Sequence, residues 1–361
     1  MITKVNELIS KLPPTERNLC ERLFLVSSGI GQLQVPPHKR ASVEEIFGSY
    51  RTVERQQIVR ITNRVTLETT IYNELRSSRP QQVDKSLDLE KLVEAGRGQA
   101  DPFNQPTEDT TADIFGRVEG AYSVTASNIA KLETWHGVVV FNEFHPHKFG
   151  PEQVIDYLLT AREWAEVAHQ KDPKAIYYLF LWNCLWKAGS SVIHGHAQMC
   201  LGRDMHYGKI ERLRRDAVTY RERHKRSYFN DLVQAHRALG LTADPVDMVK
   251  ALTYLTPTRN REIILLTDLY SPELGEALYK ILAYYQSLGV TSFNVVVQMP
   301  PIRPSAEDWN GFPVLVRIVD RGDPRNRGND VGAIDLFAAE AVINDPFTLA
   351  RGLREWLHRN R

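Results

Sequence analysis

The sequence predicts an α+β fold with two similar halves, in which helices pack on antiparallel sheets. The chain has 361 residues, which is enough for two or three domain-sized units. One order of elements (strand, helix, strand and strand) occurs twice along it. The first copy comprises 137–141, 151–170, 175–181 and 190–200, and the second comprises 262–266, 272–288, 292–297 and 314–319.

A helical extension at 1–56 is expected to precede the two halves, which we place at 57–245 and 246–361. The run Pro-Pro-Thr-Glu at 13–16 is typical of a helix start. Ser42 is followed three residues later by a glutamate, a spacing typical of a capping box. We find no chemically active group in this extension.

The first half begins with β-like composition at 58–62 and 65–67. A polar stretch at 81–112 predicts a loop that contains a short helix at 87–95. The apolar run 137–141 then predicts a strand.

A helix is expected at 151–170, with Pro151 in its first turn. An apolar stripe recurs there at helical spacing and consists of Val154, Leu158, Ala161, Ala165 and Ala168. Asp172 and Pro173 end the helix. The apolar run after it predicts a buried strand that leads to Asn183.

Two histidines and a glutamine alternate in the next predicted strand, at His194, His196 and Gln198. If the run is extended, the three side chains share one face of a strand. Gly195 and Ala197 then occupy the other face, where small residues let a second layer pack closely. The polar row would therefore lie on rigid backbone.

This row suits attack on a phosphorus atom. A neutral imidazole is a good nucleophile near pH 7 and forms covalent intermediates. The Gln198 amide and the hydroxyl of Ser190 or Ser191 could donate hydrogen bonds to phosphoryl oxygens. The alternative interpretation is that both histidines only satisfy local hydrogen bonds of a strand.

The residues around the row resemble the galactose-1-phosphate uridylyltransferase and dinucleoside-polyphosphate phosphorylase branch of the histidine-triad superfamily. The matching positions are Asn183, Gly189, Ser191, His194, His196 and Gln198. The chain departs from the uridylyltransferase pattern at Gly195, where that branch usually has proline. The resemblance implies tandem histidine-triad halves, of which the second lacks the catalytic motif. It also implies that His196 is the nucleophile that carries the nucleotide.

The resemblance implies further substrate contacts. Arg76 and Arg79 match an Arg-x-x-Arg-Pro element that binds nucleotide phosphates, a task that suits guanidinium groups. Asn128 matches an asparagine that contacts the nucleoside. Asn183, together with Ser190 and the serine after it, belongs to the substrate-binding set.

The resemblance also bears on metal. Zinc-containing relatives bind the ion with a Cys-x-x-Cys pair, a histidine that corresponds to His145 and the first motif histidine, here His194. This chain has Asp101 and Asn104 where the thiolates would be expected. A neutral amide is a poor zinc ligand. We therefore expect no cofactor and no tightly bound zinc, with His145, His194 and Asp101 as candidates for a weak, degenerate site.

Composition excludes several classes of protein. The chain has 45 Lys and Arg against 44 Asp and Glu, so its net charge of +1 argues against a nucleic-acid binder. The basic run 209–226 is interpreted as the solvated face of a helix. Three cysteines form no CxxC pair, and we find neither a signal peptide nor a long apolar run. A cytoplasmic protein without membrane contact is expected.

We therefore expect a nucleotidyltransferase that acts on a nucleoside diphosphate sugar through a covalent nucleotidyl-histidine. The acceptor would be phosphate or a sugar phosphate, and a homodimer is compatible with this expectation. Two alternatives stay open. One is a phosphorylase or hydrolase of dinucleoside polyphosphates or nucleotide sugars, and the other is a nucleotide-binding regulator without turnover.

Overall fold

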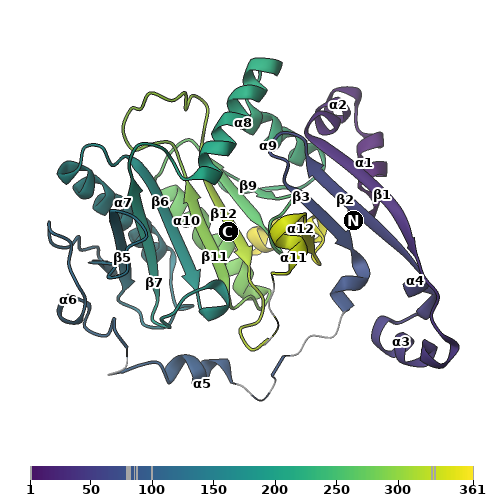
Figure 1. Ribbon diagram of the computed structural model, residues 1–361, viewed down its shortest axis with the longest axis horizontal. Coiled ribbons are helices and arrows are strands. Elements are labelled where there is room, and N and C mark those ends of the chain that lie inside the picture. Colours follow the sequence, from purple (N-terminus) through teal and green to yellow (C-terminus); the bar gives the residue numbers. More distant parts are fainter. Residues whose placement is uncertain are drawn as a thin grey trace.

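The computed structural model describes residues 2–78, 83, 84, 86, 88–98, 101–326, 328 and 331–360. Its strands form a nine-stranded sheet and a four-stranded sheet (Figure 1). The order in the larger sheet is β4, β5, β7, β6, β11, β12, β10, β9 and β8. Helices pack on these sheets, so the expected α+β class with antiparallel sheets is confirmed.

All neighbours in the nine-stranded sheet are antiparallel. In chain order its strands are β4 (Ser123–Ser127), β5 (Trp135–Phe141), β6 (Tyr177–Cys184), β7 (His196–Gly202), β8 (Thr242–Val246), β9 (Val249–Thr253), β10 (Ile263–Thr267), β11 (Phe293–Gln298) and β12 (Val314–Asp320). The two halves meet where β6 pairs with β11, at Cys184 opposite Phe293. Backbone hydrogen bonds therefore join both halves into one continuous sheet.

The four-stranded sheet corrects the expectation for 1–56. It contains β1 (Phe24–Gln32), β2 (Arg55–Asn63), β3 (Thr69–Asn73) and β13 (Glu340–Val342), and β13 runs parallel to β3. β1 lies in the segment that we expected to be wholly helical. It pairs with β2 along its full length, from Phe24 opposite Asn63 to Gln32 opposite Arg55. This long-range pairing outweighs the local helical pattern.

Helices precede and follow β1 in the sequence. They are α1 (Val5–Lys11), α2 (Pro14–Leu23), α3 (Arg40–Phe47) and α4 (Tyr50–Glu54). The expected start at 13–16 is confirmed, because Pro14 is the first residue of α2. The expected cap is wrong: Lys39 occupies the N-cap of α3, and Ser42 lies inside the helix, where its hydroxyl donates to the Lys39 carbonyl.

One face of the large sheet is covered by α7 (Pro151–Lys171) and α10 (Pro272–Ser287) (Figure 1). The predicted apolar stripe of α7 is buried along its whole length. The stripe and strand residues such as Phe180, Trp182 and Val316 belong to one apolar cluster. This cluster is the main core of the molecule.

The opposite face of the second half is covered by α9 (Tyr228–Ala238) and the four-stranded sheet. Here Leu252, Ile264 and Leu315 join residues of both elements in a second core. α8 (Gly208–His224) precedes α9, and α12 (Pro346–Arg359) ends the described chain. Short helices complete the structure: α5 (Leu89–Glu94), α6 (Pro106–Asp109), α11 (Ala333–Phe337), and the 3-10 turns η1 (Ile2–Lys4), η2 (Pro37–Lys39), η3 (Glu74–Ser78) and η4 (Trp186–Ala188).

The expected boundary between 245 and 246 falls inside a strand. β8 pairs with β9, so the two strands form one unit of the second half. Residues 242–246 therefore pair with the second half. None of the helices that the structure describes is long and apolar enough to cross a membrane.

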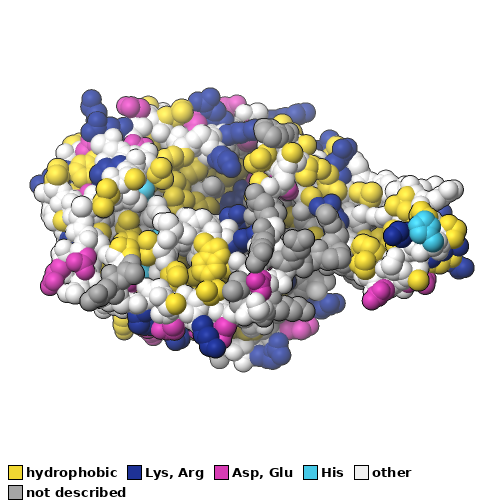
Figure 2. All heavy atoms as spheres, turned by 60° about the horizontal axis from the view of Figure 1, so that its bottom comes forward, with side chains coloured by type: hydrophobic (Ala, Val, Ile, Leu, Met, Phe, Trp, Pro, Cys, Tyr) yellow, Lys and Arg dark blue, Asp and Glu magenta, His cyan; other side chains and the backbone are white. Residues whose placement is uncertain are grey.

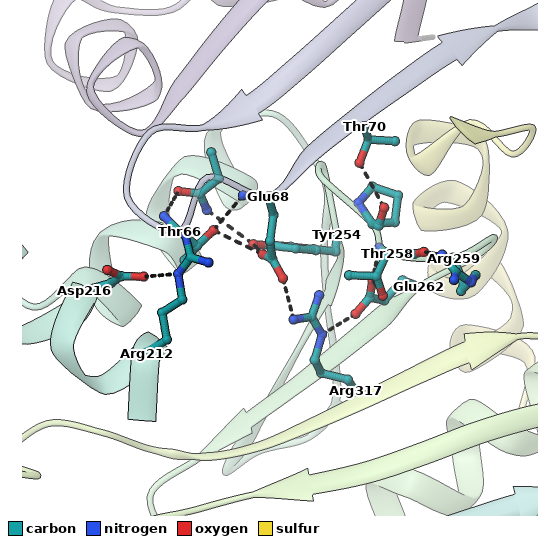
Figure 3. Close-up of polar contacts among 12 residues, drawn as sticks. Thr66, Glu68, Thr70, Arg212, Asp216, Tyr254, Thr258, Arg259, Glu262 and Arg317 are labelled. Carbon is teal, nitrogen blue, oxygen red and sulfur yellow. Dashed lines mark hydrogen bonds and ion pairs between the residues drawn. The ribbon is translucent and has the colours of Figure 1, made fainter. Parts of the chain in front are cut away.

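A buried ion cluster connects the two sheets (Figure 3). Arg317 of β12 contacts Glu262 through Nε at 2.5 Å and Glu68, in the turn between β2 and β3, through Nη1 at 2.6 Å. The Tyr254 hydroxyl also donates to Glu68, at 2.6 Å. Burial disfavours the charged form of Arg317 and lowers its pKa. The attraction of the two carboxylates has the larger effect, so the pKa of Arg317 lies well above its usual value.

Candidate active site

The predicted strand of the motif exists, but it begins at His196. His196 lies opposite Val140 of β5 and Gln198 lies opposite Val138, so the histidine and the glutamine share one face of β7. His194 precedes the strand in an irregular segment, which the alternation argument did not anticipate. Its ring still lies near that of His196, because Phe103 contacts both imidazoles edge-on.

Two contacts disfavour proline or a larger residue at the position of Gly195. Its N–H donates to the Phe144 carbonyl at 2.9 Å, which a proline could not do. A Cβ at this position would also lie 2.7 Å from the Phe141 ring and 3.1 Å from the Glu143 carbonyl oxygen. The segment that follows β5 therefore packs directly against the backbone between the two histidines.

Both ring nitrogens of His194 are engaged inside the protein. Nδ1 lies 2.6 Å from the Asp101 carboxylate, and Nε2 donates to the Phe141 carbonyl at 2.8 Å. The two contacts hold the ring at both of its nitrogens. The side chains of His194 and Asp101 are buried, at 6% and 2% exposure. His194 is therefore fixed as a structural support beside His196.

His196 has a defined tautomer. Its Nδ1 lies 2.7 Å from the backbone carbonyl of His194, an acceptor, so Nδ1 carries the proton. Within the part of the chain that the structure describes, Nε2 has no hydrogen-bond partner. Burial lowers the pKa of His196, and the backbone hydrogen bond only partly opposes it. The residue therefore presents a neutral ring with a lone pair on Nε2, the form that a nucleophile needs.

Gln198 is held by a residue that we did not predict. His136 of β5 lies on the same face, and its Nε2 is 3.0 Å from the Gln198 side-chain oxygen. Asn128 is close to this pair, because its amide nitrogen lies 3.4 Å from the same Nε2 and its backbone N–H donates to the His136 carbonyl. His136 escaped prediction because it lies in an apolar strand whose pairing with β7 cannot be read from the sequence.

The loop between β6 and β7 carries the two predicted serines. Hydrogen bonds within the protein already engage the side chains of several predicted substrate-binding residues. Ser190 is buried and its hydroxyl donates to the Val192 carbonyl at 2.6 Å, whereas Ser191 is exposed. The Asn183 side-chain oxygen accepts from Asn294 of β11 at 2.6 Å. Asn183 thus ties the two halves together across their shared strands.

Of the two expected phosphate-binding arginines, the structure describes Arg76 only. Arg79 lies outside the described residues. Arg76 lies in η3 and lines a pocket with residues of the N-terminal elements, namely Phe47, Val53, Gln56, Asn73 and Leu75. Its Nε is buried, and no hydrogen-bond partner for it occurs in the described ranges. Arg76 therefore lies beside α3 and α4.

The residues expected at a zinc site do not fit the ion. His145 Nδ1 accepts from the His147 backbone N–H at 3.2 Å, so its Nε2 carries the proton and faces Glu90 at 3.1 Å. His194 has no free nitrogen either, and Asp101 is its partner. No group of three or more His, Cys, Asp or Glu side chains suited to a metal occurs among the described residues. Protein hydrogen bonds therefore hold both histidines.

Over the first half, the face of the large sheet that carries His196 is covered by a small apolar cluster. The cluster consists of Val124, Ala126, Val138 and Val140, with Phe103 packed on it. Figure 2 shows a hollow in the molecular surface with hydrophobic walls and with Lys or Arg side chains inside it.

Solved structures with the same fold were found. An ADP-glucose phosphorylase from Arabidopsis thaliana with bound ADP-glucose aligns at a TM-score of 0.63 and 15% identity, over 81% of this chain and 97% of the other. A GalT-like protein from Arabidopsis thaliana aligns at 0.59 and 15%, over 72% and 93%. A uridylyltransferase aligns at 0.57 and 15%, over 67% and 86%. No protein-family model and no curated protein sequence matches the chain. At this identity the likeness establishes the fold, which is the one that the motif implied.

Proposed function

We propose that this protein is a nucleotidyltransferase that acts on a nucleoside diphosphate sugar, with His196 as the covalent carrier of the nucleotide. The observation that carries the proposal is the fixed tautomer of His196. Its Nδ1 proton is committed to the His194 carbonyl, so the lone pair lies on Nε2 of a buried, neutral ring. A buried histidine that served only local hydrogen bonds would have no reason to leave its second nitrogen without a protein partner.

The reaction is a double displacement. Nε2 of His196 attacks the α-phosphorus of the substrate, an N–P bond forms, and the bond to the oxygen of the departing sugar phosphate breaks. An oxygen of the acceptor then attacks the same phosphorus, and the N–P bond breaks to restore the imidazole. The Nδ1 proton stays on its nitrogen throughout, where its contact with the His194 carbonyl stabilises the positive ring of the intermediate.

Gln198 supports this chemistry from the same strand face. Its oxygen faces His136, so its amide N–H groups are available to a non-bridging phosphoryl oxygen. Ser191 is the second candidate donor, because it is exposed whereas the Ser190 hydroxyl is engaged by Val192. Neither role needs a metal ion.

The neighbours in structure support the substrate class. One of them is an ADP-glucose phosphorylase that was solved with ADP-glucose, and another is a uridylyltransferase. Both names refer to transfer chemistry of nucleotides, and ADP-glucose is a nucleoside diphosphate sugar. We propose the same class of substrate for this chain, with phosphate or a sugar phosphate as acceptor.

Intact mass spectrometry tests the proposal. The protein is incubated with a panel of nucleotide sugars and dinucleoside polyphosphates, and a mass increase of one nucleotidyl group is expected with at least one of them. His196→Asn should abolish the adduct. His147→Asn is a suitable control, because His147 is a half-buried histidine whose Nε2 donates to the Thr291 carbonyl.

The second half-reaction separates the remaining alternatives. Addition of phosphate to the adduct releases a nucleoside diphosphate from a phosphorylase, and water alone releases a monophosphate from a hydrolase. A protein that binds a nucleotide but forms no adduct in rapid-quench experiments would be a regulator, and the covalent proposal would then be wrong.

A further inference from the structure

His136 lies one strand away from the proposed nucleophile and is almost fully buried, at 1% exposure. It belongs to β5, and it shares a sheet face with Gln198 of β7. Its two ring nitrogens have different partners. Nε2 lies 3.0 Å from the Gln198 side-chain oxygen, and Nδ1 lies 3.0 Å from the backbone nitrogen of Leu132.

The contact with Leu132 determines where the proton of His136 lies. A backbone N–H can only donate, so Nδ1 must accept with its lone pair. The single proton of the neutral ring is then on Nε2, and it is donated to the Gln198 oxygen. Burial lowers the pKa of His136 and so favours this neutral ring.

The turn that supplies Leu132 is itself fixed. The Asn128 backbone N–H donates to the His136 carbonyl at 2.9 Å, and Lys131 donates to the same carbonyl at 3.2 Å. The Asn128 side-chain oxygen accepts from the Ala130 N–H at 3.0 Å. The orientation of the His136 ring is therefore set by the backbone of residues 128–136.

An amide side chain has two ends of similar shape and opposite function. The NH₂ end donates to a phosphoryl oxygen, whereas the oxygen end would repel it. With His136 donating to the Gln198 oxygen, the NH₂ end is directed away from β5. Without that donor, nothing in the described contacts of Gln198 distinguishes the two orientations.

We propose that His136 is a positioning residue that holds the Gln198 amide with its NH₂ group toward the transferring phosphoryl group. The inference rests on the proposed nucleotidyl transfer and adds a residue to it. His136 does not contact the reacting atoms. It acts by removing the non-productive orientation of Gln198.

The test measures the single-turnover rate of adduct formation on His196. Gln198→Ala removes the donor and should lower this rate by about 10²–10³-fold. His136→Asn is too short to reach Gln198 and should lower it by about 10–100-fold, as for other residues that orient a functional group through a hydrogen bond. His136→Gln has nearly the reach of the imidazole and an amide N–H to donate, so it should restore most of the rate. Substrate affinity should change little in all three variants.

The double variant decides between positioning and a general structural role. If His136 acts only through Gln198, His136→Asn should cause no further loss in the Gln198→Ala background. Losses that multiply in the double variant would overturn the inference, as would a failure of His136→Gln to exceed His136→Asn. His206→Asn is the matched control, since His206 is equally buried at 1% but bonds to the Met299 carbonyl outside the site.

Failure of the positioning role can be distinguished from failure of the proposed function. A wild-type protein that forms no adduct contradicts the transferase itself. A wild-type protein that forms the adduct and depends on Gln198, but not on His136, contradicts only the positioning role. Thermal unfolding of each variant verifies that the folded state is retained.

Discussion

At the scale of single residues, His196 combines burial with a hydrogen bond that fixes its tautomer. Burial lowers the pKa of the ring below its ordinary value of 6.5. The neutral form is the nucleophile, so activity is lost only when pH falls through the lowered pKa. We expect the acid limb of the adduct-formation rate to have its midpoint below pH 6.5. A rate profile between pH 4 and 8 measures it, and a midpoint above 6.5 would contradict the assignment.

Gly195 offers a second test at this scale. Gly195→Pro removes the N–H that donates to Phe144 and places a ring where Phe141 is 2.7 Å from the Cβ position. The lost hydrogen bond and the overpacking together should lower the free energy of unfolding by roughly 2–4 kcal/mol. Urea denaturation measures this change.

Gly208→Pro is the matched control for this variant. Gly208 is the first residue of α8, where proline is tolerated, and nothing lies within 4 Å of its Cβ position. We expect a change of less than about 1 kcal/mol there. If both substitutions lowered the free energy of unfolding equally, the close packing at Gly195 would not be the cause of the loss.

At the scale of elements, the sequence was most informative where an apolar pattern extended over many residues or where several motif residues lay close together. The helix at 151–170 and the strand 175–181 were predicted to within a few residues of α7 and β6. β1, β8, β9 and β13 were missed. β1 and β13 pair with strands that are distant in the sequence, whereas β8 and β9 form a hairpin with an irregular register, so their alternation is hard to recognise. β13 has only three residues and pairs in parallel with β3, more than 260 positions away.

The candidate site was predictable to a similar extent. Spacing placed His196 and Gln198 on one face, and the structure agrees. The partners that orient them, the His194 carbonyl and His136, depend on a turn before β7 and on the register of β5. Neither can be obtained from residue spacing. Arg76 was grouped with the histidines by resemblance, and the structure places it in a pocket with Phe47.

The segment around Asp101 carries a prediction about metal. It brings the carboxylate to within 2.6 Å of His194. Since the ring nitrogens of His194 and of His145 are committed to protein partners, we expect far less than one zinc per chain after dialysis. Elemental analysis of protein purified without chelator or affinity metal measures it. A retained content of about one ion per chain would contradict the expectation.

At the scale of the whole molecule, one sheet spans both halves and a second sheet closes over part of it. The pairing of β6 with β11 makes the nine-stranded sheet continuous, and the Asn183 to Asn294 hydrogen bond crosses the same seam. β7, which carries His196 and Gln198, lies next to β6. Its position therefore depends on the second half, although that half contributes no catalytic motif.

Arg317 links the two sheets and provides the final prediction (Figure 3). It is the shared partner of Glu68 and Glu262, and the Glu262 side chain is fully buried. Arg317→Met keeps much of the side-chain volume but leaves a buried carboxylate without its cation. Removal of one member of such a pair destabilises proteins by roughly 3–5 kcal/mol. We expect a loss of this size in the free energy of unfolding by urea denaturation.

Arg303→Met is the control for that loss. Arg303 pairs with Glu166 on the surface, and the two side chains are 42% and 30% exposed. Exposed pairs contribute about 0–1 kcal/mol, so this variant should unfold close to the wild type. If Arg317→Met were no more destabilising than Arg303→Met, the ion cluster would not be what holds the four-stranded sheet to the large sheet. The apolar contacts of Val59 and Ile61 with Ile264 and Leu315 would then have to account for that attachment.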